Sequence, residues 1–162
     1  MIQRVQTIFL FLVAVSMIAL LFMPLWQKSD PATSEMLTMD AFNLYFVKMQ
    51  EDGTRALIDT KPTYYISIGA VLVALVALFS IFKYTNRLLQ IKLGALISFL
   101  ILLLMMLIYY LFTRANSIIL PNQQGEFLYG FYMPAIALIF NFLANRFIRR
   151  DEKLVRSADR IR

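Results

Sequence analysis

Apolar residues are gathered in four runs of 19 to 21 residues, which more polar segments separate. None of the runs contains Asp, Glu, His or Lys, and their one charged residue, Arg146, lies near the end of the last run. An α-helix of about 20 apolar residues covers the roughly 30 Å hydrocarbon core of a bilayer. The first run lacks a small-x-small cleavage site, so we expect it to remain as a helix. The pattern predicts four membrane-spanning helices, at residues 5–25, 63–82, 94–112 and 128–148.

The longest segment between the runs, residues 27–62, has a pattern of its own. Residues 43–49 and 54–60 are rich in aromatic and β-branched side chains and flank an Asp-Gly pair. Two such runs around this turn predict a β-hairpin. An isolated hairpin is marginally stable in water, so it needs a surface to pack on. The hairpin is therefore either a recognition surface or a small cap over the helices. Its candidate partner contacts are Tyr45 and Phe46.

The C-terminal segment, residues 149–162, returns to a helical spacing of apolar residues. Leu154, Ala158 and Ile161 follow one another at i, i+4 and i+7, which puts them on one face of a helix. The stripe is narrow, so its own affinity for lipid is expected to be weak. This pattern predicts an amphipathic helix that lies on the membrane surface or docks on a partner protein.

Small and polar residues form one stripe along the fourth predicted helix. Helices in lipid associate through close packing of small residues and a few hydrogen bonds, so this stripe is more informative than the leucines around it. An amide inside a span needs a hydrogen-bonding partner. Three roles remain open for the amide at position 141: a hydrogen bond between helices, a lining for a substrate path or lipid headgroup, and an assembly interface. The stripe consists of Gly130, Pro134, Ala137, Asn141 and Asn145.

Basic residues are distributed unevenly between the two sides that these spans define. Eleven of the 16 Lys and Arg residues lie at the N-terminus, in residues 83–92 or in residues 146–162. Residues 27–62 contain six of the ten acidic residues. By the positive-inside rule, both termini are predicted to be cytoplasmic. The net charge of +6 is then mainly a topology signal, and we predict no nucleic-acid partner.

Composition removes most kinds of catalytic and cofactor chemistry. The chain has no Cys and no His, and therefore no thiolate nucleophile, no histidine base and none of the usual Zn, Cu or haem ligands. No ionisable group lies near the middle of a span, where secondary transporters usually need one. We predict no cofactor and no enzymatic activity. The enzymatic alternative relies on the six acidic residues of residues 27–62.

The fold class that these patterns predict is an all-α membrane protein. A four-helix transmembrane bundle carries a small extracytoplasmic β-hairpin and a cytoplasmic C-terminal amphipathic helix. Residues 1–162 form a single membrane domain, because no segment outside the runs is long enough for a separate soluble enzyme domain.

Both ends of the chain resemble a known family. The resemblance is carried by the first seven residues, by the Pro-Leu-Trp sequence at 24–26, and most specifically by residues 151–162. These residues are similar to those of a family of small four-span inner-membrane proteins of Bacteroidota, a domain of unknown function. The resemblance covers the whole chain and implies a bacterial inner-membrane location. It implies no activity and no catalytic residue.

These observations favour a non-enzymatic accessory or scaffold subunit of a bacterial inner-membrane assembly. Its expected partners are membrane lipids and an integral-membrane protein, which would contact the 27–62 loop and the C-terminal tail. The alternative is a small carrier or binding protein for a lipid or small molecule, which would use the polar stripe of the fourth helix.

Overall fold

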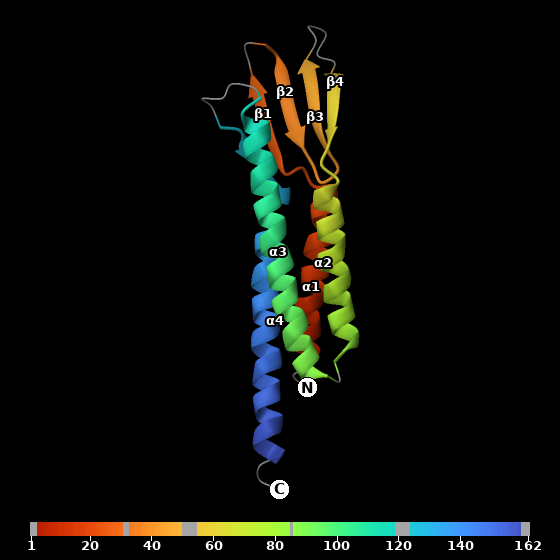
Figure 1. Ribbon diagram of the computed structural model, residues 1–162, viewed down its shortest axis with the longest axis vertical. Helices are drawn as coiled ribbons and strands as arrows, with labels where there is room; N and C mark the ends of the chain where they lie inside the picture. Colours follow the sequence, from red (N-terminus) through yellow and green to blue (C-terminus); the bar gives the residue numbers. More distant parts are fainter. Residues whose placement is uncertain (1–2, 31–32, 50–54, 85, 119–123, 160–162) are drawn as a thin grey trace.

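A computed structural model describes residues 3–30, 33–49, 55–84, 86–118 and 124–159, without the side chains of residues 3–4, 55 and 156–159. Four helices lie side by side, and a β-sheet covers one end of them (Figure 1). We call this the sheet end, and the opposite end, where α1 begins and α4 ends, the terminal end. In chain order the elements are α1 Gln3–Phe22, β1 Trp26–Asp30, β2 Glu35–Met39, β3 Asn43–Met49, β4 Arg55–Pro62, α2 Tyr65–Phe82, α3 Arg87–Asn116, β5 Glu126–Phe127 and α4 Tyr129–Asp159.

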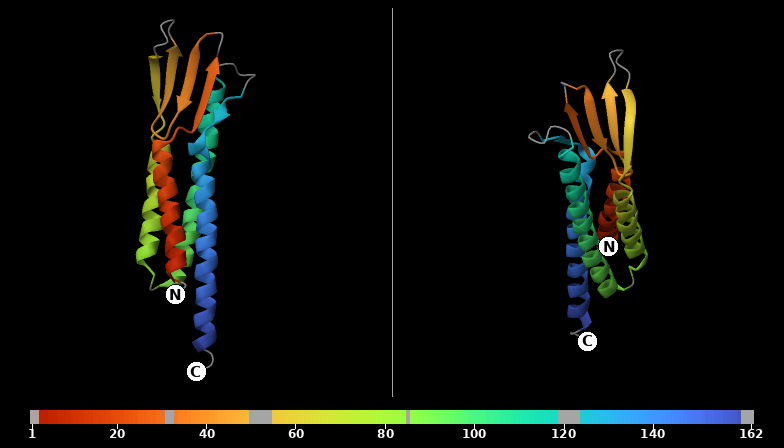
Figure 2. Two further views of the ribbon diagram at one scale, coloured as in Figure 1. Left: turned by 180° about the vertical axis from the view of Figure 1, so that it is seen from behind. Right: turned by 45° about the horizontal axis from the view of Figure 1, so that its top comes forward.

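Within the described residues, four helices are long and apolar enough to cross a membrane. Each packs against two others, in the cyclic order α1, α2, α3, α4 (Figure 2). The inward faces bury small and branched side chains, whereas large apolar side chains on the outward faces are exposed. Exposed apolar faces are what lipid-facing helices require, so the arrangement is compatible with a multi-pass membrane protein. Examples of these outward residues are Phe11, Leu75, Met106 and Phe142.

The prediction of an all-α fold is wrong, because the sheet is a substantial second layer. It has five antiparallel strands in the order β4-β3-β2-β1-β5. The predicted hairpin supplies only β3 and β4, and the turn between them lies outside the described residues. β1 was missed because its sequence is polar. Its alternate residues Trp26, Lys28 and Asp30 are nevertheless buried, with 0%, 4% and 7% of their surfaces exposed.

Two helices extend beyond the apolar runs that predicted them. α3 begins at Arg87 instead of residue 94, and the Asn86 side chain caps it by accepting a hydrogen bond from Leu89 N at 3.0 Å. α4 continues without interruption to Asp159, so the predicted C-terminal helix is present up to that residue as the last turns of α4 and not as a separate helix. No Gly or Pro lies between 148 and 159 to end the helix. The last turns of α4 project past the other helices (Figure 1).

Backbone hydrogen bonds join the sheet, the segment after α1 and the starts of α2 and α4. The segment after α1 bonds both to β2 and to the start of α4, and the start of α2 bonds to the β2–β3 turn. These bonds are Leu25 N to Met39 O (2.8 Å), Leu128 N to Leu25 O (3.0 Å), Gly130 N to Pro24 O (3.1 Å), Thr63 N to Phe42 O (2.8 Å) and Ser67 N to Ala41 O (3.2 Å).

A buried lysine connects the sheet to the remaining helix. Lys28 Nζ donates hydrogen bonds to the Asn116 backbone oxygen (2.9 Å) and to Asn116 Oδ1 (3.0 Å), at the last residue of α3. A cation at a helix C-terminus interacts favourably with the helix dipole. Burial disfavours the charged amine and lowers the pKa of Lys28 below its usual value. All four helices are thus attached to the sheet by hydrogen bonds.

Candidate functional site

A buried polar contact joins α3 to α4. Asn141 is fully buried on α4, and its Nδ2 donates hydrogen bonds to Gly94 O and to Ser98 Oγ, both at 2.8 Å. Ser98 Oγ in turn donates to Gly94 O at 3.2 Å. The amide donor at position 141 is therefore used in holding the two helices together, as in the first of its three possible roles.

Asn145 lies one turn further along α4 and packs on the same glycine. A Cβ atom built on Gly94 would overlap the Asn145 carboxamide, so only glycine allows this approach. Asn145 Oδ1 is buried and has no hydrogen-bond partner among the described residues. Asn141 Oδ1 is also buried without a partner among the described residues, so each of the two amides leaves an acceptor unused, which costs stability.

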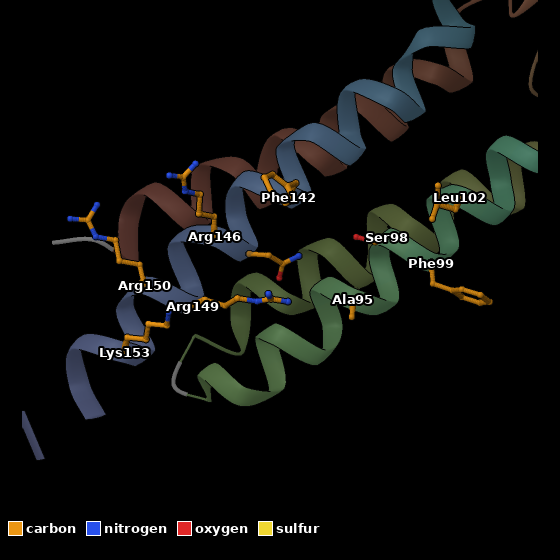
Figure 3. Close-up of a pocket in the computed structure, with 10 residues that line it drawn as sticks. Ala95, Ser98, Phe99, Leu102, Phe142, Arg146, Arg149, Arg150 and Lys153 are labelled. Carbon is orange, nitrogen blue, oxygen red and sulfur yellow. The ribbon is translucent and has the colours of Figure 1, made fainter. Parts of the chain in front are cut away.

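A groove of about 930 Å³ runs beside these residues between α3 and α4. Its volume falls in the range of roughly 300 to 1,000 Å³ that is typical of small-molecule sites. Towards the sheet end its walls are apolar and exposed, as lipid-facing surfaces are. Ser98 and Asn145 lie in the middle of its length. The apolar walls come from Ala95, Phe99 and Leu102 on α3 and from Phe142 on α4 (Figure 3).

The groove is basic towards the terminal end. Four cationic side chains of α4 line it there, spaced as i, i+3, i+4 and i+7, which places them within an arc of about 100° on the helix. Arg149 extends from α4 towards α3, and Arg146 and Arg150 lie on the outer side of α4 (Figure 3). No carboxylate lines the groove in the described part of the chain. The four cations are Arg146, Arg149, Arg150 and Lys153.

Side-chain contacts join the helices at the terminal end. Arg87 Nε at the start of α3 lies 3.1 Å from Asp151 Oδ2 on α4, with both side chains partly buried. Gln90 Nε2 donates to Ser80 O at 2.9 Å, and Gln6 Nε2 lies 3.4 Å from Gln90 Oε1. The ion pair of Arg87 with Asp151 helps to set the register of α4 against α3. It also engages Asp151, the acidic residue next to Arg150 in sequence.

The other residues that the sequence singled out lie in different places. On α4, Gly130, Pro134 and Ala137 are buried against neighbouring elements. In β3, Tyr45 and Phe46 are half-buried, and Leu154 on α4 is half-exposed. The Ala158 side chain and Ile161 lie outside the described residues. The polar stripe and the predicted contact residues thus do not form one site.

Comparison with known families places the chain. One family pattern matches residues 2–161, almost the whole sequence. The chain belongs to this family, DUF4293, which is described as a domain of unknown function. No curated protein matches the chain. The family thus supplies no activity for this chain. The residues that line the groove are the guide to the chemistry of the groove.

The arrangement is suited to holding an anion with an apolar part. Arginine and lysine donate charge-assisted hydrogen bonds to phosphate or carboxylate oxygens. Among the described residues, no group of three or more potential metal ligands occurs. No Asp, Glu or His that the structure describes lines the groove. Its cationic and amide side chains are suited to binding an anion.

Sequence reasoning missed the basic face because it divided this part of α4 between two segments. Arg146 was assigned to a span, and residues 149–162 were assigned to a separate tail. A helical wheel drawn continuously from residue 141 to residue 153 would have put the four cations next to Asn145. The close packing of Asn145 on Gly94 has no signal in the sequence, because it depends on the register between two helices.

Proposed function

We propose that this DUF4293 protein is a non-enzymatic accessory subunit of a bacterial inner-membrane protein assembly. The observation that carries the proposal is an apolar patch on the sheet, formed by Met49, Leu57 and Ile58, which we call the tip patch. These side chains are 46%, 61% and 58% exposed. They lie on β3 and β4 towards the ends of these strands that are far from the helices (Figure 1).

The position of the tip patch favours a protein partner over lipid. Leu57 precedes Pro62, the last residue of β4, by five residues, which is about 17 Å of extended strand. The tip patch therefore stands clear of the bilayer surface that the helices define. An exposed cluster of large apolar side chains in water marks a contact site for protein.

The edge of β4 disfavours addition of another strand. Phe46 pairs with Asp59 and Val47 pairs with Leu57, so Ile58 is an extra residue in a β-bulge. Bulges and charged side chains such as Lys61 protect sheet edges from pairing with other chains. The proposed occupant is accordingly the extramembrane part of a second integral-membrane protein, which would contact the tip patch through apolar side chains.

The proposed topology puts the sheet outside the cytoplasm and the terminal end inside it. Basic residues are concentrated at the terminal end, and the resemblance of the chain ends supports an inner membrane of Bacteroidota as the location. The chain has no Cys, so single-cysteine variants have no background. In intact spheroplasts, a membrane-impermeant maleimide should label Ser29→Cys and not Lys83→Cys. The reverse labelling would contradict this orientation.

The subunit proposal predicts a partner that is captured from the tip patch alone. Ile58→Cys, carrying a short photo-cross-linker, should give one discrete adduct with a second membrane protein in native membranes. Ser29→Cys is the matched control, because Ser29 is exposed on β1 of the same sheet. Adding Leu57→Asp to Ile58→Cys should reduce the adduct about tenfold, because the substitution places a charge in the apolar contact.

Two outcomes would overturn the proposal. One is equal cross-linking from Ile58→Cys and Ser29→Cys, which would indicate random collision. The other is the absence of any adduct together with a monomeric mass in mild detergent. The thermal unfolding of each variant is measured in parallel, so that loss of the fold is recognised.

A further inference from the structure

The α3–α4 groove changes its chemical character along the membrane normal. Its half nearer the sheet is lined by exposed apolar side chains, including Phe99 and Phe142, which are 62% and 67% exposed. Its half nearer the terminal end is lined by four cations. Phospholipids have the same order of apolar chain and charged headgroup. The groove therefore matches an amphiphile lying parallel to the helices (Figure 3).

The cations lie at the level where a lipid phosphate is found. The ion pair between Arg87 and Asp151 places residue 151 of α4 beside the first residue of α3, where the helix array ends. Arg146 precedes Asp151 by five residues, or about 7.5 Å of helix. Arginine and lysine near a helix end extend their charged groups to the headgroup layer. Basic clusters between helices on one membrane side commonly bind anionic headgroups.

The cluster keeps a net positive charge. Its four cations have two carboxylates beside them in sequence, Asp151 and Glu152, and Asp151 pairs with Arg87, outside the cluster. Several like charges on one helix face repel one another. An anion held between them relieves this repulsion, whereas a zwitterionic headgroup with no net charge relieves less of it.

Asn145 lies between the two halves. Its buried Oδ1 lacks a described partner and accepts hydrogen bonds only. Oδ1 itself is buried against Gly94, and Asn141 Oδ1 is buried without a described partner in the same way. The cationic cluster is therefore the observation that selects the headgroup.

We propose that the α3–α4 groove binds a bilayer phospholipid with an anionic headgroup. One acyl chain lies against Phe99, Leu102 and Phe142. The phosphate contacts Arg149, and the remaining cations surround the headgroup. This site does not depend on the protein partner proposed for the tip patch, because the two surfaces lie at opposite ends of the molecule.

The test is lipid titration of the delipidated full chain in mild detergent, followed by native mass spectrometry. The probes are phosphatidylglycerol and phosphatidylcholine with identical acyl chains. Wild type should bind phosphatidylglycerol about tenfold more tightly. The double substitution Arg149→Gln, Arg150→Gln should remove this preference. A matched control, Lys83→Gln with Lys92→Gln, removes two exposed charges from the same end outside the groove and should change affinity by less than about twofold.

A second variant tests the space of the groove without changing charge. Ala95→Trp fills the exposed groove wall and should weaken phosphatidylglycerol binding about tenfold while the four cations remain. If only the arginine variant loses binding, the lipid adsorbs to surface charge and the groove proposal fails. Equal binding of both lipids also overturns it, and so does displacement of the lipid by millimolar inorganic phosphate, which would identify a free-anion site. Because Ala95 and the arginines are tested separately, misfolding of one variant leaves the other decisive.

Discussion

Substitution of Asn141 by aspartate will lower the free energy of unfolding by about 3 kcal/mol, the order of cost of an acidic side chain at the centre of a span. The two side chains have nearly the same shape, but the carboxylate replaces the amide donor of Asn141. That donor serves Gly94 O and Ser98 Oγ at 2.8 Å, at a position with no exposed surface. Thermal unfolding in detergent, followed by circular dichroism, measures the loss.

The same substitution one turn away is the control. Asn145→Asp places its carboxylate in the groove near Arg149, so the loss there should stay below about 1 kcal/mol. Ser98→Ala removes one acceptor of the Asn141 amide and should cost about 0.6 kcal/mol, the average for hydrogen bonds between membrane helices. Equal losses at positions 141 and 145 would show that the buried donor has no special part in joining α3 to α4.

Substitution of Gly130 by alanine will destabilise the junction between α1, the sheet and α4 by about 2 kcal/mol. An added Cβ would lie 2.7 Å from Pro24 O and 2.9 Å from Met23 O, which are backbone atoms. They cannot move away without breaking the Gly130 N to Pro24 O hydrogen bond of 3.1 Å. The fluorescence of Trp26, the single tryptophan, reports on this junction during unfolding.

Gly69→Ala is the matched change at a helical glycine that tolerates it. There the added Cβ meets Leu104 Cδ1 at 2.9 Å, the far end of a flexible side chain. Better helix propensity, worth up to about 1 kcal/mol, should offset that contact and leave stability nearly unchanged. If the two alanine variants unfold at the same temperature, close backbone approach at Gly130 is not what holds α4 in place.

The sequence identified the helices because a bilayer imposes a minimum length of apolar chain. It placed their ends less well. The polar residues Arg87, Gln90 and Lys92 set the predicted start of the third helix at residue 94. An α-helix nevertheless extends through polar residues where its backbone hydrogen bonds continue. The Asn86 cap was a usable signal, since Asn before a helical segment is a strong N-terminus marker.

The sheet was predicted only where its pairing is local. β3 and β4 are neighbours in sequence around a turn, whereas β5 pairs with β1 across 99 positions, as Gln27 and Glu126 show. A two-residue strand has no periodicity of its own. The buried polar residues of β1 are explained by contacts such as that of Lys28 with Asn116, which no local pattern reveals.

The candidate site was predicted in its parts but not as a whole. Asn141 and Asn145 were recognised as polar residues of the last span, whereas the basic residues were used only to predict topology. Their meeting in one groove depends on the pairing of α3 with α4. That pairing is set by contacts such as Gly94 with Asn145, which are a property of the register between the helices.

The attachment of all four helices to one sheet determines where the molecule is able to move. At the sheet end, backbone bonds and the Lys28 contact hold the helices together. At the terminal end the chain leads from α2 into α3, and the described contacts of α4 with α3 are made by side chains, such as that of Arg87 with Asp151. α4 extends about 35 Å from Gly130 to Lys153. A tilt of about 5° at the sheet therefore displaces Lys153 by about 3 Å. A small tilt of α4 at the sheet is therefore amplified at the mouth of the α3–α4 groove.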